Sequence, residues 1–228
     1  MRHQFIISGI GLVTLLGLVL IVRFSHRTTP MPTINTGTQP ATNVNAANLS
    51  TPTPAVSDPF VVTPINDFSE RVTKKPFGIY ITPTLSPVQP EKFTGYHTGA
   101  DAEAAPAEAT LDIPIVAIAE GVVMFAGHVN GYGGVIVIRH TINDETILAL
   151  YGHLRITSFT VSANKPVKAG QQIAVLGTGF TNETDGERKH LHFSIINRST
   201  ISYRGYVAKK SELSDWIDPI VWLKNHTL

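Results

Sequence analysis

The segment Val-Ile-Val-Ile-Arg-His-Thr-Ile-Asn-Asp-Glu-Thr-Ile-Leu-Ala-Leu-Tyr, residues 135–151, decides the fold class. It holds two runs rich in β-branched and apolar residues, 135–140 and 146–151, on either side of Asn143-Asp144. Such runs favour β-strands, and Asn and Asp favour the tight turns of β-hairpins. The segment therefore predicts two antiparallel strands joined by a short turn.

Similar short runs, separated by turn residues, continue in both directions along the chain. Strands are expected at 77–82, 113–119, 121–127, 157–162, 172–176 and 190–196, with a turn at 130–134. Strands this closely spaced leave little room for crossover helices, so they predict a mainly β domain built on an antiparallel sheet. Near the end, Ser214 is expected to cap a short amphipathic helix that includes Trp216 and Leu223 and packs on the sheet.

The composition excludes several classes of protein. The chain has 228 residues, a formal net charge of +1, nine histidines and no cysteine. This length suits one domain with a linker, and the near-neutral charge excludes the broad basic surface of a nucleic-acid binder. The absence of cysteine excludes a disulfide framework, zinc fingers, iron–sulfur clusters and thiol nucleophiles. Any metal site must therefore use histidine and carboxylate side chains.

The N-terminal region, residues 1–27, is predicted to enter a membrane. The run from Phe5 to Val22 is uncharged and nearly all apolar, which is long enough to span a bilayer and long for the core of a signal peptide. No small-x-small cleavage site follows, and Arg23 and Arg27 come next. The sequence thus predicts a signal-anchor helix, with a cleaved signal peptide as the alternative. Basic residues on both flanks leave its orientation open.

Residues 28–58 are predicted to form a disordered linker. From Thr28 to Ser57 there is no Lys, Arg, Asp or Glu, and Thr, Pro and Asn supply 17 of the 30 residues. Such a stretch cannot bury enough apolar surface to offset its chain entropy. The linker would give reach to a folded body, expected at 59–228, that searches outward from the membrane.

Three motifs in the body carry histidines. They are His97-Thr-Gly-Ala-Asp101, Tyr151-Gly-His153-Leu154 and His190-Leu-His192-Phe193. Side chains two residues apart on a strand point to the same face, so His190 and His192 are expected to face one space while Leu191 packs in a core. That arrangement suits a shared zinc pocket.

The residue types fit a catalytic zinc site. Such a site takes three protein ligands and leaves one position open. His97, Asp101 and one histidine of the His-x-His pair supply three ligands without sulfur. The other paired histidine and His153 remain free to transfer protons or to stabilise an oxyanion, so the parts for metal-assisted hydrolysis of an amide are present. The remaining histidines, His140 among them, are expected to be structural.

Taken in this order, the motifs resemble those of the lysostaphin-type zinc metalloendopeptidases, the LytM or M23 family. Three further segments are similar to the family pattern: Ala119-Glu-Gly-Val-Val, Gly131-Tyr-Gly-Gly-Val and Val167-Lys-Ala-Gly-Gln-Gln-Ile. The resemblance covers roughly residues 77–223 and is specific, because all three motifs occur in the family's order.

The resemblance implies zinc bound by His97, Asp101 and His192, with catalytic roles for His153 and His190. It implies a mainly β fold, an antiparallel sheet of the duplicated-hybrid-motif kind with a groove above it and a short C-terminal helix. The implied substrate is the peptide part of bacterial peptidoglycan. A domain with that substrate would lie outside the cytoplasm, held at the cell membrane by the anchor or secreted if the leader is cleaved.

Two stretches depart from the family pattern. Residues 102–112 are longer than the usual turn and 180–189 are acidic and polar; both are expected on groove walls.

Two other functions stay open. One alternative is a non-catalytic peptidoglycan-binding or hydrolase-activating module with a regulatory protein partner. Members of that kind usually lack one or more ligands, whereas this chain has all five positions. The other alternative is a zinc hydrolase with a different substrate.

Overall fold

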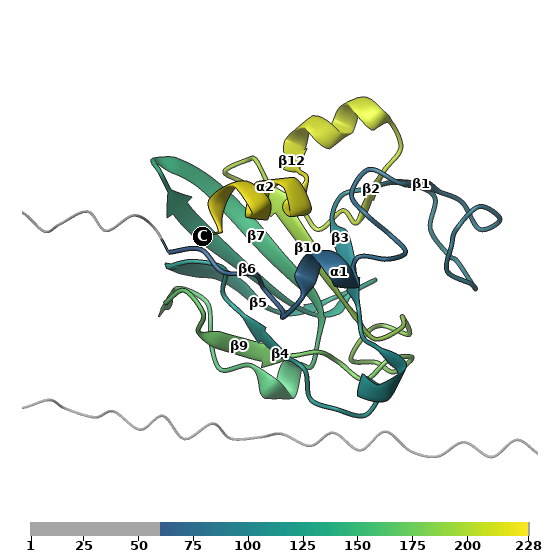
Figure 1. Cartoon of the computed structure of the whole chain (residues 1–228), viewed down its shortest axis with the longest axis horizontal. Coiled ribbons are helices and arrows are strands. Elements are labelled where there is room, and N and C mark those ends of the chain that lie inside the picture. The colour runs from purple at the N-terminus through teal and green to yellow at the C-terminus, as the bar shows by residue number, and fades with distance from the viewer. Residues whose placement is uncertain (1–59, 228) are drawn as a thin grey trace, which may run out of the picture. The chain divides into compact units, whose positions relative to one another are not determined.

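The computed structural model describes residues 60–227 (Figure 1). The signal-anchor expected at 1–27 and the linker expected at 28–58 lie outside the described residues and stay predictions. Within 60–227, no helix combines the length and the apolar character needed to cross a membrane.

The central sheet has seven strands, and every pair of neighbours in it is antiparallel, as the sequence predicts. The strands are β3 (Ala100–Glu103), β5 (Gly121–Val129), β6 (Gly133–Ile142), β7 (Glu145–Leu154), β8 (Pro166–Val167), β10 (His190–Ile196) and β12 (Trp216–Ile217). Their order is β12-β10-β7-β6-β5-β8, and β3 pairs with the first half of β10 (Figure 1).

The hairpin that decides the fold class forms as expected. β6 and β7 pair from Ile142 and Glu145 onward, with Asn143 and Asp144 in the turn. Both turn residues have positive φ, 50° and 64° respectively. Asn and Asp tolerate this left-handed region better than other residues with a side chain, so the two residues permit the tight connection.

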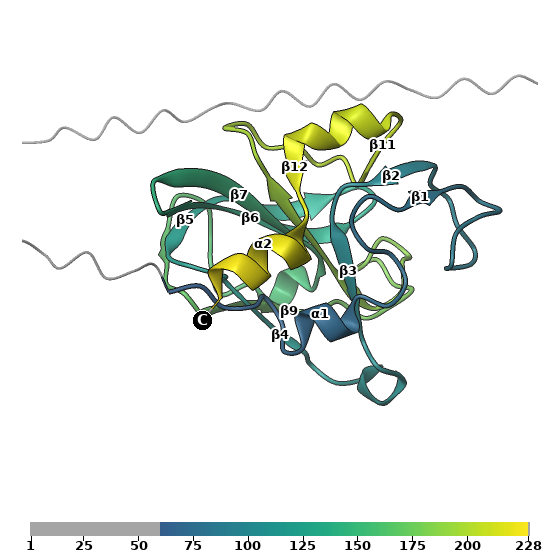
Figure 2. The same cartoon turned by 45° about the horizontal axis from the view of Figure 1, so that its top comes forward.

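Alternate residues of β6 enter two separate hydrophobic cores, which is the period expected of a strand buried on both faces. Ile136 and Ile138 belong to the larger core, whereas Val135 and Val137 belong to the smaller one. Three further parts of the chain cover the larger core: α1 (Phe68–Arg71), α2 (Pro219–His226) and the two-stranded sheet of β4 (Pro114–Val116) and β9 (Gln172–Val175) (Figure 2).

A small sheet lies against the opposite face. It consists of β1 (Tyr80–Ile81), β2 (Gly95–His97) and β11 (Tyr206–Val207), in the order β1-β2-β11. Val207 packs in the smaller core with Leu213 of the 3-10 helix Lys210–Asp215 and with Trp216 of β12. The small sheet thereby holds His97, at the end of β2, over this face of the central sheet.

One expected strand, 157–162, is wrong. Ile156–Ser158 forms a 3-10 helix, and the residues after it join β9 through a single backbone hydrogen bond, from Thr160 N to Ile173 O at 3.0 Å. Phe159 and Val161 nevertheless pack on the larger core. The alternation of apolar residues in 157–162 therefore reflects the burial of one side of an extended loop, and not the pairing of a strand in a sheet.

The expected start of the C-terminal helix is also wrong. Ser214 belongs to the preceding 3-10 helix, and Trp216 and Ile217 form β12. α2 begins only after Asp218, whose Oδ1 accepts a hydrogen bond from Ile220 N at 2.9 Å. The Asp-Pro pair at 218–219 is a better start signal than Ser214, because Asp caps free N–H groups and Pro fits the first helical position.

His140 has the structural role expected of it. Its side chain is buried, its Nδ1 donates to Glu120 O at 2.9 Å, and its Nε2 has no hydrogen-bond partner. Burial lowers the pKa of His140 to about 4 from an ordinary 6.5. The folded state therefore keeps this imidazole neutral over a pH range in which the unfolded chain protonates it.

We expect this difference to make stability depend on pH. A depressed folded pKa stabilises the protein above pH 6.5, and that contribution is lost as pH falls toward 4. Urea unfolding near pH 7 and about pH 4.5 should show the wild type losing about 2 to 3 kcal/mol more than His140→Asn. His128→Asn, at an exposed position, serves as control and should follow the wild type. Equal losses in His140→Asn and wild type would contradict the expectation.

Candidate metal centre

The pairing of β3 with β10 brings the first and third motifs together. In this antiparallel register Asp101 lies opposite His192, and Glu103 lies opposite His190. His190 and His192 line one cavity of about 320 Å³, whereas Leu191 is in the larger core, as the strand period predicts. His153, the second-last residue of β7, lines the same cavity.

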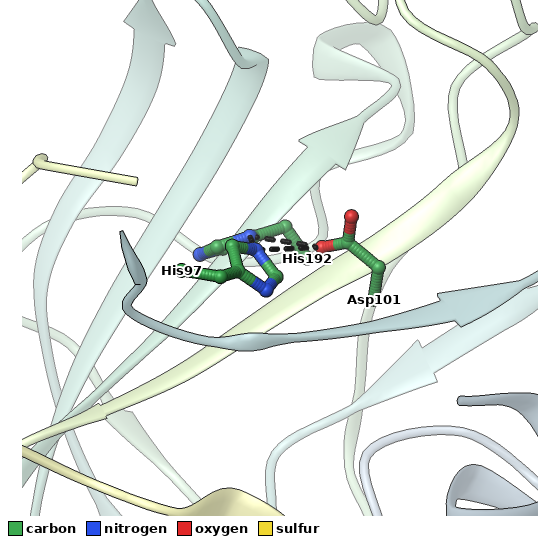
Figure 3. Close-up of side chains that lie close together, drawn as sticks. All are labelled: His97, Asp101 and His192. Carbon is green, nitrogen blue, oxygen red and sulfur yellow. Dashed lines mark hydrogen bonds and ion pairs between the residues drawn. The ribbon is translucent and has the colours of Figure 1, made fainter. Parts of the chain in front are cut away.

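Three potential ligand atoms form a small triangle (Figure 3). His97 Nε2 lies 3.1 Å from His192 Nδ1 and 3.2 Å from Asp101 Oδ1, and His192 Nδ1 lies 3.0 Å from Asp101 Oδ1. Zinc held tetrahedrally at its usual distance of about 2.0–2.1 Å would separate its ligand atoms by about 3.3 Å. The triangle therefore has the size that a zinc ion requires.

Backbone carbonyls fix the tautomers of the surrounding histidines. Nδ1 lies 3.2 Å from Pro76 O in His97, 3.2 Å from Thr184 O in His153 and 2.8 Å from Arg188 O in His190. A carbonyl only accepts hydrogen bonds, so each Nδ1 carries the hydrogen. In His97 and His153 a neutral ring then leaves Nε2 with a free lone pair, whereas His190 Nε2 faces Asp101 Oδ2 at 3.3 Å, to which an Nε2–H would donate.

His192 is oriented the other way. Its Nδ1 belongs to the triangle, where an Nδ1–H would donate to Asp101 Oδ1 at 3.0 Å, and its Nε2 lies 3.4 Å from Tyr132 Oη. His97 Nε2 offers a lone pair and Asp101 Oδ1 a carboxylate oxygen, so both atoms face the same hydrogen on His192 Nδ1. A metal ion could replace that single hydrogen, with the ring of His192 then carrying its hydrogen on Nε2 toward Tyr132 Oη, so the residues present fit a metal ion.

Burial and nearby charges shift the pKa values of these groups. Burial alone would raise the pKa of the Asp101 carboxyl, but the neighbouring His190 and His97, with hydrogen bonds from His190 and His192, hold it well below its usual range. Burial lowers the pKa of His192 to about 4. Burial, followed by the nearby His190, also lowers the pKa of His153 well below its ordinary value. Near neutral pH, Asp101 is thus ionised while His192 and His153 are neutral.

The remaining two histidines lie against each other beside the triangle. The ring centroids of His153 and His190 are 4.2 Å apart, and His190 Nε2 lies 3.3 Å from Asp101 Oδ2. His153 has a positive φ of 61°, which is uncommon for a residue with a side chain and is often found at functional sites. The structure therefore brings all five residues of the sequence motifs to one buried place.

Sequence reasoning missed the aromatic residues of the cavity. The Tyr132 ring lies 5.1 Å from that of His192, and Tyr206 stacks on His97 at 5.1 Å, with Phe93 stacked on its other side at 5.3 Å. Tyr132 could have been found, because it stands in the glycine-rich turn that resembles the family pattern. Tyr206 and Phe93 carry no local signal, since only the pairing of β2 with β11 brings Tyr206 to His97.

Gly99, between the first two motif residues, was also missed. A Cβ added there would lie 2.7 Å from His192 Nε2 and 2.6 Å from Phe193 O. The backbone of the His-x-x-x-Asp motif thus approaches β10 more closely than a side chain allows, which is what lets the motif reach His192.

The two unusual stretches behave differently. Glu187 and Arg188, from 180–189, line the cavity as expected. The expectation that 102–112 forms a wall is wrong for this cavity, because none of those residues lines it. Arg71 of α1 holds this stretch away from the cavity with two hydrogen bonds to the Glu108 carboxylate, at 2.7 and 2.8 Å.

The tautomers give a direct test of this geometry. Long-range ¹H–¹⁵N spectra of the imidazoles near neutral pH should show the hydrogen on Nδ1 in His153, because Thr184 O fixes it there. In the zinc-loaded protein His192 should show the opposite tautomer, with the hydrogen on Nε2, because its Nδ1 binds the metal, and it thereby serves as internal control. An Nε2–H tautomer in His153 would contradict the structure.

Comparison with known proteins agrees with the motifs. The model of Peptidase family M23 matches residues 95–203, a range that holds all five histidine and aspartate positions of the centre. The murein hydrolase activator NlpD of Salmonella dublin is 33% identical over 161 residues, which make up 69% of this chain and 37% of that protein. This chain thus spans well under half the length of that relative.

Two further proteins are similar to part of this chain. Lipoprotein NlpD of Yersinia enterocolitica is 40% identical over 83 residues, covering 36% of this chain and 75% of that protein. The solution structure of lysostaphin is similar with 29% sequence identity and a TM-score of 0.42, over 58% of this chain and 44% of that chain. The family model and the relative that is covered over most of its length lead to one conclusion: the chain belongs to peptidase family M23.

Proposed function

We propose that this chain is a zinc-dependent metalloendopeptidase that cleaves peptide bonds in bacterial peptidoglycan. The observation that carries the proposal is the meeting of the five motif residues: Asp101, His153, His190 and His192 line one cavity, and His97 Nε2 lies 3.1 Å from His192 Nδ1 and 3.2 Å from Asp101 Oδ1. In this proposal His97 Nε2, Asp101 Oδ1 and His192 Nδ1 hold the zinc ion, and His153 and His190 act on the substrate.

The ligand set suits zinc in chemistry as well as in size. Neutral imidazole and carboxylate are ordinary zinc ligands, and the low pKa of His192, about 4, means that protons compete weakly for this ligand near neutral pH. A bound zinc ion would polarise the scissile carbonyl and make a water molecule acidic enough to attack it near neutral pH.

His153 is the better candidate for the general base. Thr184 O holds its Nδ1–H, so the Nε2 lone pair is the atom that accepts the proton of the attacking water. Because burial lowers the pKa of His153, the ring is neutral and ready to accept that proton. The same Nε2–H would then donate the proton to the leaving amine.

His190 and Tyr132 would stabilise the charge that develops on the carbonyl oxygen. His190 is held on one side by Arg188 O and on the other by Asp101 Oδ2, so its ring is fixed before substrate binds. Burial raises the pKa of Tyr132, and the nearby Asp101 adds to this, so its hydroxyl stays protonated and able to donate. Fixed donors of this kind favour a transition state without reorganisation.

The N-terminal region gives the proposed location. The apolar run 5–22 would anchor the chain in the cell membrane, with the linker 28–58 carrying the domain outward to the wall. The relatives named as a murein hydrolase activator and a lipoprotein support a site of action at the cell wall.

The second candidate is a non-catalytic module that activates another wall hydrolase. The observation in its favour is the similarity to the Salmonella dublin relative, which is named as a murein hydrolase activator. The complete set of five residues and their mutual geometry favour catalysis instead, since a purely activating role requires none of them.

Digestion of purified peptidoglycan tests the proposal. The full-length protein in detergent should release soluble peptides from isolated sacculi, lose this activity with a strong chelator and regain it with zinc. His153→Ala should lower the rate by about 10²- to 10⁴-fold, the usual contribution of general acid–base catalysis. Asp101→Ala should abolish it by removing a ligand.

His128→Ala, exposed and outside the cavity, is the control and should keep full activity. Peptide release that survives Asp101→Ala and chelation would contradict the proposal. A protein that binds sacculi and releases nothing alone, but accelerates a separate wall hydrolase, would establish the second candidate.

A further inference from the structure

A buried arginine lies directly behind the candidate metal ligands. Arg188 is only 8% exposed and lies between two carboxylates of β3. Its Nη2 donates to Asp101 Oδ2 at 2.9 Å, and its Nε donates to both carboxylate oxygens of Glu103 at 2.9 Å. Neither the family motifs nor the proposed chemistry assigns a role to Arg188 or to Glu103.

The two oxygens of Asp101 have separate partners. Oδ1 faces His97 Nε2 and His192 Nδ1, at 3.2 and 3.0 Å, within the ligand triangle. Oδ2 faces away from the triangle, toward Arg188 Nη2 at 2.9 Å and His190 Nε2 at 3.3 Å. The guanidinium thus holds the carboxylate so that a single oxygen points at the metal position.

The arrangement follows from the alternation of side chains along β3 and β10. His190 and His192 alternate along β10, and Asp101 and Glu103 alternate on β3, so each pair presents one face, and Arg188 lies two residues before β10. The antiparallel register then places the arginine at the end of the same ladder that joins ligand to ligand. The cavity lining includes Arg188, which places its side chain on the site's side of the sheet.

The charges around Arg188 indicate that the Arg188–Glu103 pair orients the Asp101 carboxylate. Glu103 balances the positive charge of Arg188, so the pair adds no net charge beside the metal position. Lys74 Nζ lies 3.5 Å from Glu103 Oε2, at the outer end of the network. A planar guanidinium that bonds two carboxylates at once fixes their directions, which a flexible ammonium group does less well.

We infer that Arg188 is a positioning residue that holds Asp101 in single-oxygen coordination of the metal, with Glu103 holding Arg188 in place. The inference rests on the proposed zinc site. Groups that orient a ligand from behind usually contribute about 10- to 100-fold to metal affinity. If Arg188 acted only through its charge, its removal would change zinc affinity in the opposite direction. The positive guanidinium repels a metal cation, so removing it would tighten zinc binding.

Zinc affinity of the metal-free full-length protein, measured by competition with a chromophoric chelator, separates the two roles. Arg188→Met should bind zinc about 10- to 100-fold more weakly than wild type. Arg188→Lys keeps the charge, so a charge role predicts no change, whereas positioning predicts weaker binding here as well. Arg155→Met is the matched control: Arg155 also pairs with two carboxylates, Asp112 and Glu183, and its loss should leave zinc affinity unchanged.

Absorption spectra of the Co²⁺-substituted proteins give a second readout that altered stability alone would not produce. Release of Oδ2 should let Asp101 bind through both oxygens, raising the coordination number and weakening the visible bands in Arg188→Met and Arg188→Lys. Circular dichroism checks that each variant is folded, and Arg188→Lys decides the question if Arg188→Met is not.

The possible failures are distinguishable. Wild type that binds no zinc would overturn the proposed function and this inference with it. Wild type that binds one zinc per chain, together with Arg188 variants that bind zinc as tightly or more tightly, would overturn only the inference.

Discussion

The register of β3 against β10 is the constraint on which the rest of the site depends. It sets Asp101 opposite His192 and Glu103 opposite His190, so ligand and supporting side chains meet across one ladder. A slip of one residue would turn every one of these side chains to the other face of the sheet. The core residues Leu191 and Phe193, which alternate with the histidines, oppose such a slip because it would expose them.

Around this ladder, the fold places each remaining group by a different connection. β7, next to β10, carries His153 as its second-last residue, and the small sheet positions His97 through the pairing of β2 with β11. Backbone carbonyls then determine which ring nitrogen is free to bind or to accept a proton. The candidate metal ligands and the groups proposed to transfer protons are thus fixed by backbone geometry before any metal or substrate arrives, which is what an electrostatically preorganised site requires.

The sequence predicted the antiparallel sheet and the five motif residues, because period-two patterns and histidine spacing are local signals. It did not predict Tyr206, Phe93 or the Arg188–Glu103 pair, whose roles arise only from contacts between distant strands. The errors at 157–162 and at Ser214 have a related cause: apolar spacing reports which residues are buried, whereas strand pairing and helix capping depend on hydrogen bonds elsewhere. The role of 102–112 likewise followed from a contact with α1 that no local pattern revealed.

The central claim is that β3, β10 and β2 together build one zinc site. Crystallography of the zinc-loaded protein, with anomalous diffraction collected at the zinc absorption edge, tests it most directly. The account predicts one strong peak bonded to His97 Nε2, Asp101 Oδ1 and His192 Nδ1, with Asp101 Oδ2 still on Arg188. A peak at another place, or none within the triangle, would contradict it.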